Sequence, residues 1–148
     1  MQNLLYRWLL LVGLAHVVLG VILAFAAHLS IAQPYFDYLH ASVSNQPPPV
    51  QYQQLLRTLF SLFGPTIASW GLLFCALVAL YRRHGHRPIK PLLLAALLLW
   101  CALDSGISLH FGLALHAYLN AAAALSIALP LLLLRPLRAC RQAPPAEA

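Results

Sequence analysis

The sequence predicts an all-α integral membrane protein: one domain, residues 1–148, with four transmembrane helices running up-down-up-down. Three observations predict this fold class. The 148 residues are 61% hydrophobic and only 8% charged, whereas a soluble domain carries about a quarter charged residues. Four apolar runs are each long enough to cross a bilayer, for which about 20 residues suffice. Basic residues gather at the ends of these runs, on alternate connections, as membrane topology requires.

The spans are predicted at residues 8–27, 58–80, 91–109 and 113–134. An outer loop of about 30 residues, 28–57, joins the first two. Its aromatic part, QPYFDYLHAS, suits either a plain connector or a short helix on the membrane surface. The last two spans are divided only by SLHFG, which is enough for a tight turn between antiparallel helices. The tail, 136–148, is predicted to be disordered.

The charge distribution predicts the orientation. With four spans, Arg57 is the one basic residue on its side of the membrane, and the other side carries Arg7, Arg82, Arg83, Arg87, Lys90, Arg135, Arg138 and Arg141. The positive-inside rule then places both termini in the cytoplasm. The Leu/Ala/Arg-rich composition suggests a bacterial inner membrane. A competing interpretation treats the first span as a signal peptide cleaved near the small-residue sequence AFA at 24–26.

Small residues recur every three or four positions along the first two spans. The first carries Gly13, His16, Gly20 and Ala24, and the second carries Ser61, Gly64, Ala68, Gly71, Cys75 and Ala79. Such spacing places each set on one helical face. Since lipid does not drive helices together as water does, close approach of small residues is expected to hold the bundle.

The strongly polar residues of the spans are expected to meet inside the bundle. At about 1.5 Å of rise per residue, Asp104, Asn120 and Thr66 all fall about 5 Å to the outer side of the midplane. Ser108 lies one turn from Asp104 on the same helical face. His16 falls about 9 Å below Asp104 along the axis, so it joins the cluster only through tilt or a water molecule.

Asp104 has two interpretations. An unpaired charge at this depth costs several kcal/mol, so the carboxyl group is expected to be paired or protonated. Intramembrane ionisable residues are candidates for proton handling or ligand binding. A neutral Asp104 could equally bond Asn120, Thr66 or Ser108 and fix the helix register, and His16 is open to the same structural interpretation.

No cofactor follows from the sequence. His28, His110 and His116 are expected near the outer surface, where imidazoles bind metals or haem. They are weak metal candidates, since their spacing matches no recognised ligand pattern and no HExxH, CxxC or CxxCH occurs. The cysteines, Cys75, Cys101 and Cys140, imply no disulfide framework.

Three functional hypotheses from different classes remain. The first is a non-enzymatic accessory or scaffold subunit that packs against another membrane protein or against copies of itself. The second is a carrier or binder of a small lipophilic molecule such as a quinone or lipid, or a proton-handling protein, using Asp104, His16 and Asn120. The third is a haem- or metal-binding redox protein. The absence of a catalytic motif argues against an enzyme, and the basic residues form no nucleic-acid patch.

The overall layout resembles that of small four-span bacterial inner-membrane proteins of the DoxX type. The likeness covers the number of spans and their orientation. It implies the same helical fold and assigns no role to any residue.

Overall fold

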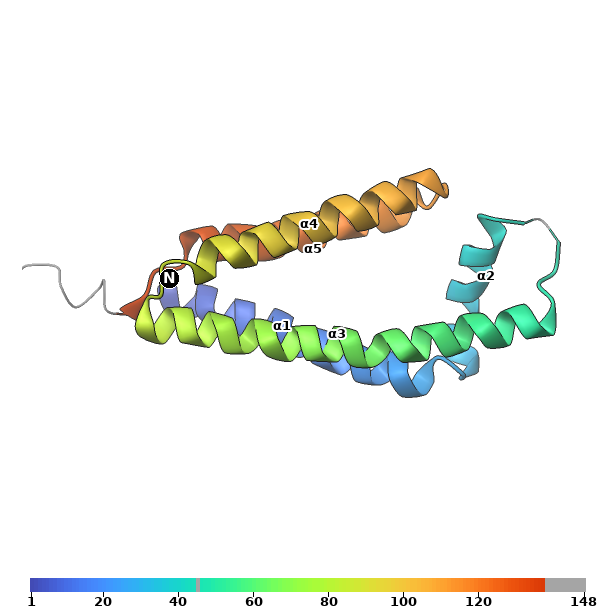
Figure 1. Cartoon of the computed structure of the whole chain (residues 1–148), viewed down its shortest axis with the longest axis horizontal. Coiled ribbons are helices and arrows are strands. Elements are labelled where there is room, and N and C mark those ends of the chain that lie inside the picture. The colour runs from blue at the N-terminus through green and yellow to red at the C-terminus, as the bar shows by residue number, and fades with distance from the viewer. Residues whose placement is uncertain (45, 138–148) are drawn as a thin grey trace, which may run out of the picture.

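The computed structural model describes residues 1–44 and 46–137, and every regular element in this part of the chain is helical (Figure 1). Four helices are long and apolar enough to cross a membrane, which confirms the predicted fold class. The elements are α1 (Gln2–Ala26), the short 3₁₀ helix η1 (Ser30–Ala32), α2 (Gln33–Ala41), α3 (Val50–His84), α4 (Ile89–His110) and α5 (Ala114–Leu133). The predicted tail lies outside the described residues from position 138 onward.

α3 is longer than the predicted second span, which was expected to begin at residue 58. It begins at Val50 and has 35 residues, or about 52 Å of helix, against a hydrocarbon thickness of about 30 Å. Gln, Leu and Arg in its first turns are good helix formers. Pro49 precedes the first turn, where its missing N–H is not needed. The start of α3 therefore projects beyond a bilayer that contains the rest.

The aromatic part of the outer loop folds as α2, directly after η1, and is not a plain connector. Pro34 stands in the first turn of α2, a position that tolerates proline. Phe36 is buried, with its ring centroid 5.2 Å from that of Phe60 on α3, and Tyr35 meets the same ring at 5.6 Å. These edge-to-face contacts hold α2 against α3.

α1 and α3 pack with their backbones in contact. A Cβ atom added to Gly64 would lie 2.5 Å from the carbonyl oxygen of Gly20, and one added to Gly71 would lie 2.5 Å from that of Gly13. Such distances are too short for any side chain, so glycine is required at these positions. The predicted small-residue stripes of the first two spans are therefore confirmed. Cleavage near residues 24–26 would strip α3 of this packing surface, and sizing the mature protein tests that alternative.

α4 and α5 form a second antiparallel pair, closed by the tight turn that the sequence predicts. Gly112 adopts φ 74°, a left-handed conformation that side chains disfavour. The backbone N–H of Leu113 donates to the carbonyl of Ser108 at 2.8 Å. This bond satisfies one of the carbonyls left free at the end of α4.

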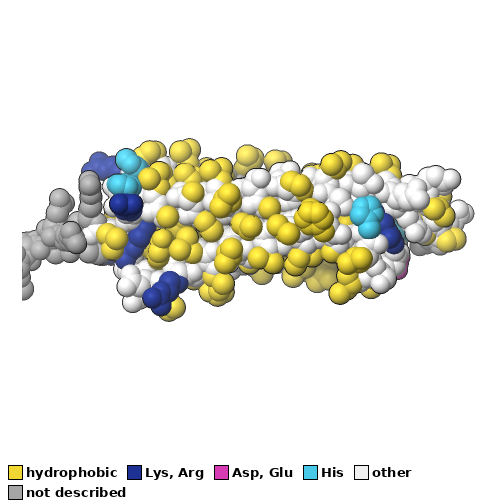
Figure 2. Space-filling view, turned by 90° about the horizontal axis from the view of Figure 1, so that it is seen from below, with side chains coloured by type: hydrophobic (Ala, Val, Ile, Leu, Met, Phe, Trp, Pro, Cys, Tyr) yellow, Lys and Arg dark blue, Asp and Glu magenta, His cyan; other side chains and the backbone are white. Residues whose placement is uncertain are grey.

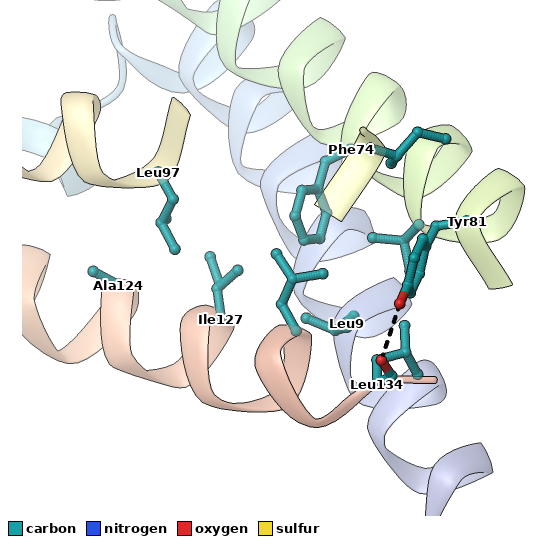
Figure 3. Close-up of a cluster of buried hydrophobic side chains, with 10 residues drawn as sticks. Leu9, Phe74, Tyr81, Leu97, Ala124, Ile127 and Leu134 are labelled. Atoms are coloured by element: carbon teal, nitrogen blue, oxygen red, sulfur yellow. Dashed lines mark hydrogen bonds between the residues drawn. The ribbon is translucent and has the colours of Figure 1, made fainter. Parts of the chain in front are cut away.

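The two pairs share a core at one end only. Leu9, Phe74, Leu97 and Ile127 come from all four long helices and are buried together. Figure 3 shows the side chains of this cluster converging between the helices, together with the bond from Tyr81 to Leu134. We call this the basic end, because the described ends of the helices there carry Arg7, Arg82, Arg83, Arg87, Lys90 and Arg135. Figure 2 shows most of the visible Lys and Arg side chains at that end of one face.

Polar side chains from three helices tie the end of α5 to the rest of the bundle. The Tyr81 hydroxyl donates to the Leu134 carbonyl at 3.3 Å, as does Lys90 Nζ at 3.3 Å. The buried Arg82 guanidinium donates to the Arg135 carbonyl and to Asn3 Oδ1, the latter at 3.1 Å. These donors satisfy the carbonyls of the two residues that directly follow α5, Leu134 and Arg135.

Pro130, in the last turn of α5, creates a further hydrogen bond between the two pairs. Because proline has no N–H, the carbonyl of Ser126, four residues earlier, has no partner within the helix. The Trp8 indole N–H, from α1, donates to this carbonyl at 2.9 Å. A carbonyl left free in the α4–α5 pair thus accepts a hydrogen bond from a side chain of the α1–α3 pair.

At the opposite end the two pairs part, as Figure 1 shows. On α3, Phe63 lies about 20° around the helix from Phe74, yet Phe63 is 60% exposed and Phe74 only 3%. On α4, Asp104 lies about 20° from Leu97, yet the Asp104 side chain is 37% exposed and Leu97 only 4%. The faces that form the core at the basic end are therefore uncovered at the other, which we call the open end.

Candidate functional site

The candidate site comprises the facing surfaces at the open end. We call it the wedge and define it by Phe63 and Trp70 on α3 and by Asp104 and His116 on the α4–α5 pair. Asp104 is six residues before the end of α4, so it lies about 9 Å inside that end. It is the one acidic residue of the described membrane-spanning helices.

Asp104 and Asn120 meet directly, as predicted. Asn120 Nδ2 donates to Asp104 Oδ2 at 2.6 Å and lies 3.4 Å from Ser105 Oγ. Asn120 is 4% exposed, and it lies about 20° around α5 from the core residue Ile127. Its amide is therefore held between the helices, and it fixes one oxygen of the carboxyl group. Oδ1 makes no hydrogen bond within the described part of the chain.

His116 extends this pair into a chain of polar contacts. His116 Nε2 lies 3.9 Å from Asp104 Oδ2, and its Nδ1 lies 3.3 Å from Ser108 Oγ. If the Ser108 hydroxyl donates to Nδ1, the imidazole proton is on Nε2, facing the carboxyl group. Ser108, His116, Asp104 and Asn120 then form one network across α4 and α5.

The order Ser–His–Asp invites comparison with a nucleophilic triad, but this arrangement cannot perform that chemistry. Ser108 is 3% exposed, so its hydroxyl cannot reach a substrate carbonyl. It lies within α4, where backbone N–H groups are engaged in helical bonds and none is free to stabilise an oxyanion. The network can accept a hydrogen bond or a positive charge at Asp104, and it can hold a proton.

The wall opposite Asp104 is aromatic. The Trp70 ring stacks on Phe74 with centroids 5.3 Å apart and is itself 37% exposed. Phe63 and Phe60 continue the same face of α3 toward the open end, where Phe60 contacts α2. A polar network thus faces an apolar, aromatic surface.

His16 and Thr66 do not join the network. His16 Nδ1 is 2.8 Å from the carbonyl of Val12 in its own helix, and its ring lies 4.8 Å from that of Trp70. The imidazole therefore packs between α1 and α3. Thr66 is exposed on α3 and makes no side-chain hydrogen bond within the described residues. Of the five residues proposed from the sequence, the structure brings together Asp104, Asn120 and, through His116, Ser108.

The three weak metal candidates lie apart. His28 follows the end of α1, and its Nε2 lies 3.3 Å from Oγ of Ser61 on α3. His110 packs edge-on against Phe111, and His116 belongs to the network. Within residues 1–44 and 46–137, no three His, Cys, Asp or Glu side chains come close enough to hold a metal ion.

α2 lies beside the wedge. Burial, followed by the negative charge of Asp104, raises the pKa of the Tyr35 hydroxyl above its ordinary value of 10.0. Two small cavities flank α2, both lined by Asp37 and His40, and neither includes a residue of the network.

Sequence reasoning missed the link that His116 makes. The signal was present, since His116 lies four residues before Asn120 and Ser108 four residues after Asp104, so each pair shares a helical face. The sequence does place His116 on the face of Asn120, but His116 was considered as a weak metal candidate near the outer surface and not as a member of the polar cluster. Ser105, the other unpredicted neighbour of Asn120, follows directly from the position of Asp104.

Comparison of the chain with protein-family models, with curated proteins and with solved structures finds no match. The likeness to DoxX-type proteins therefore remains one of layout. The chain is a small four-span helical membrane protein, and any function assigned to it depends on the chemistry of the wedge.

Proposed function

We propose that this protein is a non-enzymatic accessory subunit whose wedge receives a transmembrane helix of another membrane protein. The observation that carries the proposal is the uncovered core face. Phe63 and Trp70 continue the face of Phe74, and Asp104 continues that of Leu97, without a neighbouring helix to cover them. A carboxyl group exposed to acyl chains at this depth is costly. A helix with its own polar group would remove that cost.

The shape of the wedge favours a helix over a small molecule. Small-molecule sites are concave and enclose most of their ligand, whereas the two pairs diverge steadily toward the open end (Figure 1). An α-helix with its side chains is about 10–12 Å across, and helices insert into apolar grooves through residues repeating every three or four positions. The spaced aromatic residues of α3 suit that mode of contact.

Site-specific photocrosslinking in intact cells tests the proposal. A photoreactive phenylalanine analogue replaces Phe63 or Trp70, and the matched control is Leu72, which is 67% exposed but about 160° around α3 from Phe74. We expect Phe63 and Trp70 to give an adduct with one membrane protein and Leu72 to give none. The same adducts from all three positions, or none from the wedge, would contradict the proposal.

A second candidate is supported by the polar network itself. Asp104 and His116 present hydrogen-bonding groups beside the aromatic Trp70, a combination that suits a lipophilic molecule with a polar head such as a quinone or lipid. In that case mass spectrometry of the purified protein would show one lipophilic compound retained in stoichiometric amount. Its loss in Asp104→Asn, with the helical content unchanged, would favour this function over the first.

We further infer that the protein lies in a bacterial inner membrane with its basic end in the cytoplasm. The gathering of six described cations at one end supports this orientation through the positive-inside rule. A membrane-impermeant thiol reagent should label Ser44→Cys, at the open end, from outside the cell. It should leave Arg87→Cys unlabelled until the membrane is broken.

A further inference from the structure

No Lys or Arg of the described chain pairs with Asp104. Arg7, Arg82, Arg83, Arg87, Lys90 and Arg135 are all at the basic end. Of these, Lys90 shares α4 with Asp104 but is 14 residues away, or about 21 Å along the helix. No flexible side chain crosses that distance.

Arg57, the cation of the open end, is already engaged. Its guanidinium donates to the carbonyl of His28 at 3.1 Å and to Gln33 Oε1, and it lies 6.0 Å from the centroid of the Phe36 ring. These contacts hold Arg57 between α3 and α2. His116, at 3.9 Å, is beyond hydrogen-bond distance and leaves Asp104 Oδ1 unoccupied.

A second copy of the chain cannot supply the missing charge. A copy inserted in the same orientation brings its described cations to the same basic end and its Arg57 to the same level above α2. It therefore adds no cation at the depth of Asp104. The partner must therefore place a cation at a depth where the described part of this chain has no Lys or Arg.

We propose that the helix received by the wedge carries a Lys or Arg side chain that pairs with Asp104, about 9 Å inside the open end. This inference rests on the proposed function. In a bilayer such a charge is tolerated where an opposite charge pairs with it. The Asn120 amide holds Oδ2, so Oδ1, which has no hydrogen bond in the described part of the chain, remains for the partner. The remaining contact is between the partner's apolar face and the rings of Phe63 and Trp70.

Synthetic transmembrane peptides test the charge requirement directly. The full-length chain, labelled with a donor fluorophore, is reconstituted in lipid vesicles with acceptor-labelled Leu/Ala helices. The helices carry Lys, Gln or Leu six residues from one end. We expect the Lys helix to associate about tenfold more tightly than the Leu helix, a difference of about 1.4 kcal/mol, because polar contacts between membrane helices favour their association.

Matched variants of the protein test whether the preference for the Lys helix depends on Asp104. Asp104→Asn keeps the shape of the side chain and removes its charge. The affinity of this variant for the Lys helix should therefore fall to its affinity for the Leu helix. Asp37→Asn, which changes an exposed carboxyl group bonded to Gln33, should leave the preference unchanged. Equal binding of the Lys and Leu helices to the unaltered chain, or of the Lys and Gln helices, would overturn the proposal.

The two proposals fail separately. A crosslink from Phe63 to a partner helix with Lys or Arg in its outer half supports both. A crosslink to a helix without such a residue retains the accessory function and overturns the charge pairing. If Phe63 crosslinks only to a second copy of this chain, the charge pairing is likewise overturned, because the copy carries no cation at that depth.

Discussion

At the scale of single residues, stability depends on finding partners for backbone groups that water cannot reach. In lipid, an unsatisfied carbonyl costs several kcal/mol. Pro130 leaves the Ser126 carbonyl without its helical donor, and the Trp8 indole replaces it. Arg82, Tyr81 and Lys90 do the same for the carbonyls that end α5. Trp8, Tyr81 and Arg82, which resemble ordinary interfacial anchors, thus form hydrogen bonds between the two helix pairs, and Lys90 forms one within the α4–α5 pair.

Trp8→Phe should destabilise the fold by about 1–3 kcal/mol, because it keeps the ring and leaves the Ser126 carbonyl without a donor. Thermal unfolding in detergent measures the loss. The control is Trp100→Phe, since the Trp100 indole has no hydrogen-bond partner in the described part of the chain. In a Pro130→Ala background, the backbone N–H is restored and the effect of Trp8→Phe should shrink. An unchanged effect in that background would refute the role assigned to Pro130.

Tyr35 should titrate above pH 10.0, because burial and the Asp104 charge both disfavour the phenolate. A group whose pKa is raised on folding contributes stability that is present below its unfolded pKa and lost as the pH rises through the folded value. The docking of α2 should therefore weaken only in strongly alkaline solution. The difference in tyrosinate absorbance between the unaltered chain and Tyr35→Phe reports the titration.

Asp104→Asn is the control for this electrostatic contact. It should lower the pKa of Tyr35 while burial keeps it above 10.0. A Tyr35 titration that is identical in Asp104→Asn and the unaltered chain would show that α2 and Asp104 do not face each other.

The candidate site could be predicted in part from residue spacing. Asp104 and Asn120 were paired correctly because the tight turn fixes their relative depth. His16 could not be placed by depth alone, because its direction depends on the packing of α1 against α3. There its imidazole bonds to Val12 of its own helix and contacts Trp70. Thr66 has the right depth and lies on an exposed part of α3.

At the scale of helices, the contact between α1 and α3 was predictable and the start of α3 was not. Glycines repeating every seven residues indicate a close helix contact whatever the rest of the fold. The segment before residue 58 is polar, so an apolar-run criterion ends the span there, although its residues are good helix formers. Similarly, α2 depends on the contact of Phe36 with Phe60, and local sequence does not reveal that contact.

Gly20→Val should destabilise the protein more strongly than any surface substitution. A Cβ atom at Gly20 would overlap the Ala68 amide nitrogen and the Gly64 carbonyl, so α1 and α3 must separate. We expect a loss of about 3 kcal/mol or more, as for other overpacked interiors. Gly106→Ala is the matched control: nothing lies within 4 Å of its added Cβ, and it should be neutral or stabilising by up to about 1 kcal/mol. Comparable losses from both would contradict the close contact.

At the scale of the whole molecule, the sequence predicted four antiparallel crossings and the structure adds their divergence. Stripes of small residues indicate which faces meet but not over what depth they remain together. Here, apolar residues of all four long helices close the basic end. Toward the other end, the face of α4 that carries Leu97 has a carboxyl group, Asp104, where the core has apolar side chains. A carboxyl group does not pack against the aromatic face of α3 without a partner, which gives a physical reason for the separation.

The measurement that tests this separation most directly is pulsed electron paramagnetic resonance on the chain alone in lipid nanodiscs. Spin labels replace exposed residues of α1 and α5 in a cysteine-free background: Leu4 with Leu133 at the basic end, and Phe25 with Tyr118 at the open end. The distance across the open end should be clearly the longer of the two. In a closed bundle the helices would pack at both ends, with axes about 8–10 Å apart at their contacts. Equal distances at both ends would therefore show a closed bundle and contradict the wedge.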